Sequence, residues 1–329
     1  MLTTIIALVI AALSSGSNNL SMRQEADEFL KNMPAGLQDK QMHAIEMAIA
    51  GDTTALHSIR NSRNIPQQLP DGVEARYITP HLRLYAPTNA TKPLPLLIYL
   101  HGGGWVFGSI NSCARFCGEL AATGKAIVLA VDYRLAPENP YPAGLDDSTN
   151  ALELAFEKAE EWGSSPDLIS IGGDSSGGNL AVAAAFRNAD NPNGKNIKSL
   201  LLFYPVVYAY PDGSESWTKY GKGYGLNSDI METFNKAYIA DADKSDPSIS
   251  IGLANPDQLA KLPKTLLVAA ERDILCDQGR EFVGMLKSVG VDIKRKELTG
   301  AVHLLITVDG QEKAFRNAVK LASEFLSED

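Results

Sequence analysis

The pentapeptide Gly173-x-Ser175-x-Gly177 is the stretch whose residue types most directly suggest chemistry. It follows a short apolar run at 168–171 and precedes small residues of helical composition, so we expect the serine on a turn between a strand and a helix. Glycines on both sides permit a sharp turn, because larger side chains would collide with the strand and the helix. The turn would expose the Ser175 hydroxyl at a helix N-terminus, as a nucleophile requires. A glycine-rich turn with a helix-capping serine would give the same pattern, so other residues must decide.

A second glycine-rich stretch, His101-Gly102-Gly103-Gly104-Trp105, directly follows the apolar run at 96–100. Successive glycines let backbone N–H groups approach a substrate oxygen without obstruction. We predict that the N–H groups of Gly103, Gly104 and Ser176 form an oxyanion hole. A phosphate-binding loop is the alternative, but neither a following Lys-Ser/Thr pair nor G-x-G-x-x-G is present.

Asp273 and His303 complete a predicted catalytic triad with Ser175. Asp273 follows the apolar run at 265–269, and His303 follows a less apolar run at 292–298, where a sheet delivers functional residues at its C-terminal edge. His303 would take the proton from Ser175, and Asp273 would orient the imidazole and stabilise its cation. Glu271 and Asp277 compete for the role of the acid. We favour Asp273, since Asp277 is expected to cap the next helix and Glu271 to point away.

The elements that must position these residues alternate between apolar strands and helices. Strands are predicted at 73–79, 82–85, 96–100, 126–131, 168–171, 200–204, 265–269 and 292–298, and helices at 25–33, 39–50, 112–123, 144–161, 177–188, 279–288 and 311–326. This alternation predicts an α/β fold with a doubly wound, mostly parallel sheet. Residues 61–72 are predicted as a polar loop. The stretch at 209–262, with a helix at 229–239, interrupts the alternation and is predicted to be a helical cap.

Four sequence blocks resemble the hormone-sensitive-lipase-like carboxylesterases of the α/β-hydrolase superfamily. They are HGGGW at 101–105, DYRLAPE at 132–138, YPAGLDD at 141–147 and GDSSGGNLA at 173–181, in the order and spacing of that family. The resemblance runs from about residue 94 to the C-terminus and implies an α/β-hydrolase fold with a cap over the acyl pocket. The acid block, Asp273-Ile274-Leu275-Cys276-Asp277-Gln278, departs from the usual D-P-L-x-D-E, and Leu304-Leu305 replaces the usual Gly-Phe after the histidine.

Several other residues have two interpretations. Trp105 and Phe107, beside the oxyanion glycines, either line a substrate pocket or pack beneath the cap. Asp132, Tyr133, Arg134 and Glu138 are interpreted as a structural network of ion pairs and hydrogen bonds rather than as catalytic groups. His43, His57 and His81 stand alone without the spacing of metal ligands.

Composition restricts the partners and cofactors. The chain has 329 residues, a net charge of −9 and a pI near 5.2, which disfavours nucleic acid as a partner. Cys113, Cys117 and Cys276 form neither a C-x-x-C pair nor an even set, so no disulfide framework and no metal site is predicted. The expected ligand is a small-molecule ester, with no cofactor and no integral membrane span. A homodimer is the protein assembly that we expect.

The N-terminus carries an apolar run at 5–13, too short to span a bilayer, followed by small residues at 14–17. It is interpreted as a signal peptide, and hence as export to the periplasm or the medium. An apolar helix packed on the protein is the alternative, since no Lys or Arg precedes the run. The predicted organisation is an extension at 1–20, cap helices at 21–65 and a catalytic domain at 66–329.

Together these features predict a serine carboxylesterase that hydrolyses short- to medium-chain esters through an acyl-enzyme intermediate. A deacetylase of acetylated sugars would use the same residues. A small-molecule receptor on the same scaffold, such as the gibberellin receptors that lack the triad histidine, is a different class. The presence of His303 argues against it.

Overall fold

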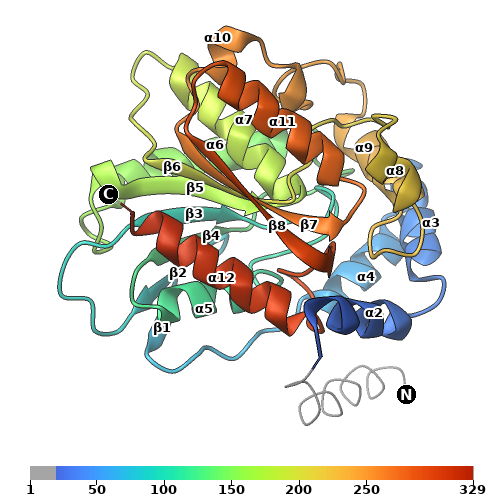
Figure 1. The fold of residues 1–329 in the computed structure, drawn as a ribbon, viewed down its shortest axis with the longest axis horizontal. Helices are drawn as coiled ribbons and strands as arrows, with labels where there is room; N and C mark the ends of the chain where they lie inside the picture. Colours follow the sequence, from blue (N-terminus) through green and yellow to red (C-terminus); the bar gives the residue numbers. More distant parts are fainter. Residues whose placement is uncertain (1–19, 329) are drawn as a thin grey trace.

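The computed structural model describes residues 20–328 as a central sheet with helices on both faces (Figure 1). The eight strands lie in the order β1-β2-β4-β3-β5-β6-β7-β8. The first two, β1 and β2, pair antiparallel with their neighbours, and β3 to β8 are parallel. The predicted mostly parallel α/β sheet is confirmed. The predicted signal peptide or apolar extension lies almost wholly outside the described residues.

The strand bounds are β1 Val73–Thr79, β2 Leu82–Pro87, β3 Leu96–Leu100, β4 Ile127–Val131, β5 Ile169–Asp174, β6 Ser199–Phe203, β7 Lys264–Arg272 and β8 Ile293–Val302. Every residue of β3, β4, β5 and β6 is buried, as a parallel sheet covered on both faces requires. The chain therefore leaves β3, β5, β7 and β8 at one common edge, where polar residues can meet.

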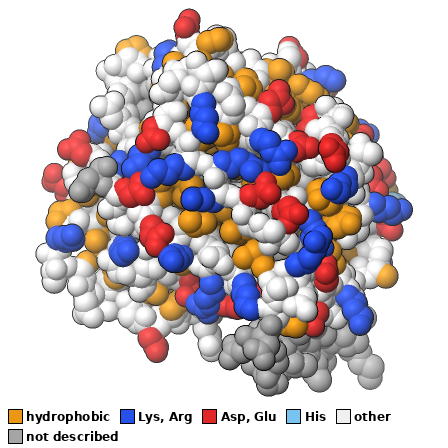
Figure 2. All heavy atoms as spheres, in the orientation of Figure 1, with side chains coloured by type: hydrophobic (Ala, Val, Ile, Leu, Met, Phe, Trp, Pro, Cys, Tyr) orange, Lys and Arg blue, Asp and Glu red, His pale blue; other side chains and the backbone are white. Residues whose placement is uncertain are grey.

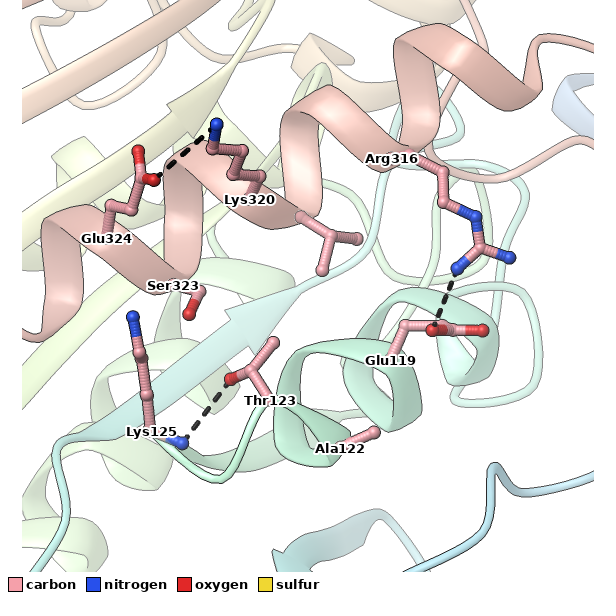
Figure 3. Close-up of a pocket in the computed structure, with 9 residues that line it drawn as sticks. Glu119, Ala122, Thr123, Lys125, Arg316, Lys320, Ser323 and Glu324 are labelled. Atoms are coloured by element: carbon pink, nitrogen blue, oxygen red, sulfur yellow. Dashed lines mark hydrogen bonds and ion pairs between the residues drawn. The ribbon is translucent and has the colours of Figure 1, made fainter.

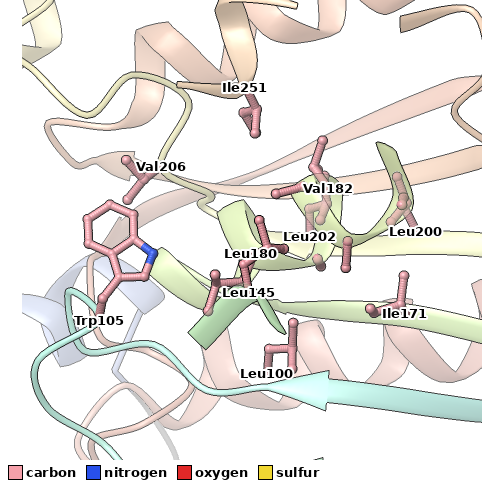
Figure 4. Close-up of a cluster of buried hydrophobic side chains, with 14 of the residues drawn as sticks. Leu100, Trp105, Leu145, Ile171, Leu180, Val182, Leu200, Leu202, Val206 and Ile251 are labelled. Atoms are coloured by element: carbon pink, nitrogen blue, oxygen red, sulfur yellow. The ribbon is translucent and has the colours of Figure 1, made fainter. Parts of the chain in front are cut away.

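Two hydrophobic layers enclose the sheet. One face is covered by α6 (Ala143–Lys158), α7 (Ser176–Asp190) and α11 (Cys276–Ser288), and the other by α5 (Ala114–Ala122) and α12 (Glu312–Leu326) (Figure 1). Figure 4 shows Leu180 and Val182 of α7 packed over Ile171 and Leu202 of the sheet. The small side chains of α7 permit this helix to lie close to the strands, which places its N-terminus at the end of β5.

Five of the remaining helices gather at the edge where the parallel strands end (Figure 1). Three come from the N-terminal segment: α2 (Met22–Asn32), α3 (Leu37–Ile49) and α4 (Thr54–Arg63). Two more, α8 (Glu215–Lys219) and α9 (Ser228–Ile239), lie between β6 and β7, and α3 packs against α9. The short α10 (Pro256–Leu259) follows them. Helices α2 to α4 and α8 to α9 come from the segments 21–65 and 209–262 that the sequence predicts as a cap, whereas α10, in the second of these segments, lies away from this edge.

Three local predictions were wrong. The predicted polar loop at 61–72 begins inside α4, a helix that the periodicity does not reveal because Leu56 is its one buried residue. The strand predicted to end at 171 continues to Asp174 as β5, and the chain turns at Ser175, where the turn was expected. Helix α11 begins at Cys276, so Asp277 lies inside its first turn and Leu275 holds the cap position.

Candidate active site

Ser175 lies at the sharp turn between β5 and α7. Its backbone has φ 55° and ψ −119°, and its side chain makes no capping bond to the helix. The backbone N–H donates to the Phe203 carbonyl at 2.9 Å, and the Ser175 carbonyl accepts from Val206 N–H at 3.2 Å. The neighbouring sheet thus holds the serine in a conformation that residues with a β-carbon rarely adopt. Its hydroxyl is left free for another partner.

The flanking glycines are explained by close backbone contacts. A β-carbon on Gly173 or Gly177 would collide with the Leu100 carbonyl oxygen at the end of β3. Any larger residue would push α7 away from the sheet and move Ser175 with it. The glycines of the motif are therefore requirements of packing at this turn.

His303 reaches Ser175 from the loop after β8. Its Nε2 lies 3.2 Å from Ser175 Oγ, and its Nδ1 lies 2.6 Å from Asp273 Oδ2. The other oxygen of Asp273 accepts from Leu275 N–H at 3.1 Å. The structure thus brings together all three predicted triad residues, buried and in the order serine, histidine, acid. With Nδ1–H facing the carboxylate, Nε2 is free to accept the serine proton.

Two residues that the sequence analysis missed hold His303 in place. Gln311 Nε2 donates to the carbonyls of Val302 and His303, and its Oε1 accepts from Val302 N–H. The Tyr204 ring packs on the imidazole with 4.5 Å between ring centroids. Neither residue belongs to a motif, because their contacts arise only when α12 and β6 meet the β8 loop.

The two competing carboxylates are engaged elsewhere. Glu271 Oε2 accepts from Gly300 N–H at 2.5 Å. Asp277 accepts from Ser216 N–H at 2.8 Å and pairs with Arg280. Of the three candidate acids, Asp273 is therefore the one that contacts the histidine.

The predicted oxyanion glycines form a turn after β3. No described residue accepts a hydrogen bond from the N–H groups of Gly103, Gly104 or Ser176. Gly103 and Gly104 have φ of 122° and 63°, and a β-carbon on Gly104 would collide with the Phe234 ring. These three backbone donors are thus available to a developing negative charge.

Asp174, beside the nucleophile, anchors the oxyanion turn. Its Oδ1 accepts from Gly102 N–H at 3.0 Å and from the Tyr99 hydroxyl at 2.8 Å. Burial raises the pKa of Asp174 to about 6, although these two hydrogen bonds favour the ionised form. One carboxylate thus fastens the end of β3 to the end of β5. The sequence analysis assigned it no role.

Trp105 and Phe107 pack beneath α9. The Trp105 ring stacks on Tyr238 with centroids 4.3 Å apart, and Phe107 meets Phe234 edge-on at 5.9 Å. Figure 4 shows Trp105 at the end of the hydrophobic cluster, beside Val206. Of the two interpretations of these side chains, packing beneath the cap describes their contacts.

The cluster at 132–138 forms structural contacts. Tyr133 donates to the His101 carbonyl at 2.7 Å, and Arg134 pairs with Asp147. Glu138 pairs with Arg60 of α4 at 2.6 Å. Because Arg60 also donates to the Val106 and Ala136 carbonyls, this network fastens α4 to the oxyanion turn.

A separate groove lies far from these residues. It has a volume of about 420 Å³ and runs between α5 and α12, where Arg316 bridges to Glu119 and Lys320 to Glu324 (Figure 3). None of the predicted site residues lines it.

Cys113, Cys117 and Cys276 are buried free thiols.

Comparison with known proteins relates the chain to esterases. A family model described as alpha/beta hydrolase fold matches residues 97–307. Carboxylesterase NlhH of Mycobacterium tuberculosis is 34% identical over 267 residues, covering 78% of this chain and 82% of that protein. An arylesterase of Saccharolobus solfataricus is 34% identical over 229 residues, covering 68% of this chain and 72% of the relative. The crystal structure of a Pyrobaculum calidifontis esterase matches with a TM-score of 0.74 at 28% identity, covering 91% and 96% of the two chains.

Proposed function

The chain belongs to the hormone-sensitive-lipase-like family of α/β-hydrolases, and from this membership we propose that it hydrolyses short- to medium-chain esters through an acyl-enzyme on Ser175. Carboxylic-ester hydrolysis as such follows from the similarity to named carboxylesterases and arylesterases. The observation that carries the residue roles is the hydrogen-bonded series Ser175–His303–Asp273 beside three unpaired backbone N–H groups.

In the first half of the proposed reaction, Ser175 Oγ attacks the ester carbonyl carbon as His303 Nε2 takes its proton. The carbonyl oxygen becomes an oxyanion that the N–H groups of Gly103, Gly104 and Ser176 stabilise. Asp273 stabilises the imidazolium. The tetrahedral intermediate then loses the alcohol, which receives its proton from His303, and Ser175 remains acylated.

In the second half, His303 takes a proton from water, and the resulting nucleophile attacks the acyl carbon. Collapse of the second tetrahedral intermediate releases the carboxylic acid and returns the proton to Ser175. No step requires a metal or an organic cofactor, because side chains supply the nucleophile and the base, and backbone N–H groups stabilise the oxyanion.

The preference for short to medium acyl groups rests on how closely the cap covers the site. Ser175 and His303 are 5% and 3% exposed. Phe234 of α9 lies against Gly104, and Tyr238 covers Trp105. Bulky aromatic side chains next to the oxyanion turn leave little room for a long acyl chain.

Hydrolysis of p-nitrophenyl esters from acetate to laurate tests this function. We expect activity to be highest on the short esters and to fall by roughly 10⁶-fold in kcat in Ser175→Ala. Ser164→Ala is the matched control, because its hydroxyl is buried without a hydrogen-bond partner. If the folded wild-type protein hydrolyses none of these esters, the proposal is contradicted. The alternatives are then tested by assays on acetylated sugars and by measurements of ligand binding without turnover.

Export and homodimer formation are also proposals. Export is supported by the apolar run at 5–13, and the N-terminal sequence of the mature protein tests it. Sedimentation equilibrium tests the homodimer. No helix among residues 20–328 is long and apolar enough to cross a membrane.

A further inference from the structure

Helix α2 lies directly on the segment that carries His303. Gly300, three residues before the histidine, has φ 88°, and a β-carbon there would meet the backbone and Cβ of Arg23 at 2.7–2.9 Å. Ala26 and Phe29 of the same helix form a small hydrophobic cluster with Val302. Thus α2 packs against residues immediately before the histidine as well as forming part of the cap.

Arg272 joins this helix to the histidine segment. It is the last residue of β7, next to Asp273, and its side chain is 6% exposed. Its Nε and Nη2 donate to the Gly300 carbonyl at 3.0 and 2.7 Å. Toward α2, Nη1 donates to Asp27 Oδ1 at 2.6 Å and Nη2 to the Arg23 carbonyl at 3.4 Å. The planar guanidinium therefore connects β7, the β8 end and α2 at once.

The ion pair between Arg272 and Asp27 ties the position of the Arg272 side chain, and through it the end of β8, to α2. Among the described residues, Asp27 is the one carboxylate that forms an ion pair with Arg272. Arg272 is 6% exposed but the Asp27 side chain is 56% exposed, so solvent screens part of this ion pair. If α2 left the protein surface, Arg272 would lose its ion pair with Asp27 and could change its position. The Gly300 carbonyl would then lose the hydrogen bonds from Nε and Nη2 of Arg272.

We propose that Arg272 is a positioning residue for His303, through which α2 becomes part of the support of the catalytic histidine. This inference rests on the proposed function, because it assumes that His303 is the base. Displacing the Gly300 segment would disturb the 3.2 Å approach of His303 Nε2 to Ser175 Oγ. Since the histidine acts in both halves of the reaction, kcat should fall whichever half is slower.

A purely substrate-covering role for α2 predicts a different result. A cover contacts the bound ester, so its loss should raise KM and change the chain-length preference. Loss of a support for His303 should instead lower kcat by a similar factor on every ester.

The test compares four variants with p-nitrophenyl acetate and butyrate. We expect Arg272→Met to lower kcat by about 10- to 100-fold with KM within two-fold, since small misplacements of a catalytic group are costly. Arg272→Lys should recover part of the loss. Asp27→Asn, which alters an exposed side chain, should lower kcat by about two- to five-fold. Glu28→Gln, the same charge change one residue further along α2 on an exposed side chain with no ion pair among the described residues, should leave kcat unchanged.

A second readout does not depend on turnover. The low-field proton resonance of the His303–Asp273 hydrogen bond should shift or broaden in Arg272→Met, or in Asp27→Asn if the first variant does not fold, and stay in place in Glu28→Gln. An unchanged resonance, or a rise in KM at constant kcat, would overturn the proposal. An ester-silent wild type would contradict the proposed function, while the resonance would still support or overturn the role of Arg272.

Discussion

At the scale of single residues, the site depends on backbone conformations that few side chains allow. Ser175, Trp105 and Leu304 all have positive φ, and each lies within one residue of a predicted functional group or is one. Such conformations persist only where surrounding structure holds them. Here the support comes from β6 for Ser175 and from Asp174 for the oxyanion turn.

Gly104→Ala tests the oxyanion turn. The added methyl group would collide with the Phe234 ring and displace a predicted oxyanion donor, so we expect kcat/KM to fall about 100- to 1000-fold. Gly124→Ala is the control, because Gly124 has a similar φ of 70° with no atom within 4 Å of the added carbon. It should lose about 1–2 kcal/mol of stability and keep its activity. Equal activity in the two variants would contradict the assignment.

Asp174→Asn tests the buried carboxyl through the pH dependence of stability. The folded-state pKa of about 6 lies above the unfolded value of 3.8, so the folded state binds more protons between these two pH values. Wild-type stability should therefore fall as pH rises from 4 to 6 and level off above, by about 3 kcal/mol from this group. The variant lacks this loss. Urea unfolding at pH 4 and pH 7 measures the free energy of unfolding of both proteins. If the difference between wild type and variant is the same at both pH values, the prediction is refuted.

At the scale of elements, the ends of the parallel strands position the predicted site residues. The ends of β3, β5, β7 and β8 bring the predicted oxyanion turn, nucleophile, acid and base to one edge. The helices from two distant segments then close over this edge, and α9 contacts the oxyanion turn through Phe234 and Tyr238. The strands thus position the predicted catalytic groups, and α9 packs beside them.

Phe234→Leu tests the role of α9 in limiting acyl length. A smaller side chain next to Gly104 should raise kcat/KM for p-nitrophenyl octanoate relative to acetate by about three- to ten-fold, since each accommodated methylene contributes binding. Phe156→Leu on α6 is the control, because the two rings are similarly buried at 6% and 5% exposure. Both should lose comparable stability. If the ratio of kcat/KM for octanoate to that for acetate is unchanged in Phe234→Leu, the acyl group does not bind beside Phe234.

At the scale of the whole molecule, the face shown in Figure 2 mixes charges of both signs, although the net charge is −9. Within residues 20–328, no group of three or more His, Cys, Asp or Glu side chains is arranged to hold a metal ion. The proposed chemistry relies instead on the triad and on backbone donors.

Removal of metals should therefore leave the enzyme active. We expect dialysis against EDTA to change kcat/KM for p-nitrophenyl butyrate by less than two-fold, because nucleophile, base and oxyanion donors are all protein groups. Assays before and after dialysis, and after adding back Zn²⁺ or Mg²⁺, measure this. A large loss that one of these ions restores would show that the mechanism lacks a component.

The sequence by itself determined the α/β alternation and the triad candidates, because both depend on local patterns. Apolar runs specify buried parallel strands, and Gly173 and Gly177 mark a turn that tolerates no side chain. The sequence favoured Asp273 as the acid without excluding Glu271 or Asp277. It missed α4, whose one buried residue is Leu56 and whose contacts to the rest of the protein come from Arg60. Only the tertiary structure identified the acid that contacts His303. It also revealed Asp174, Gln311 and Arg272 as supports, because their partners lie 8 to 245 residues away and no local pattern records such contacts.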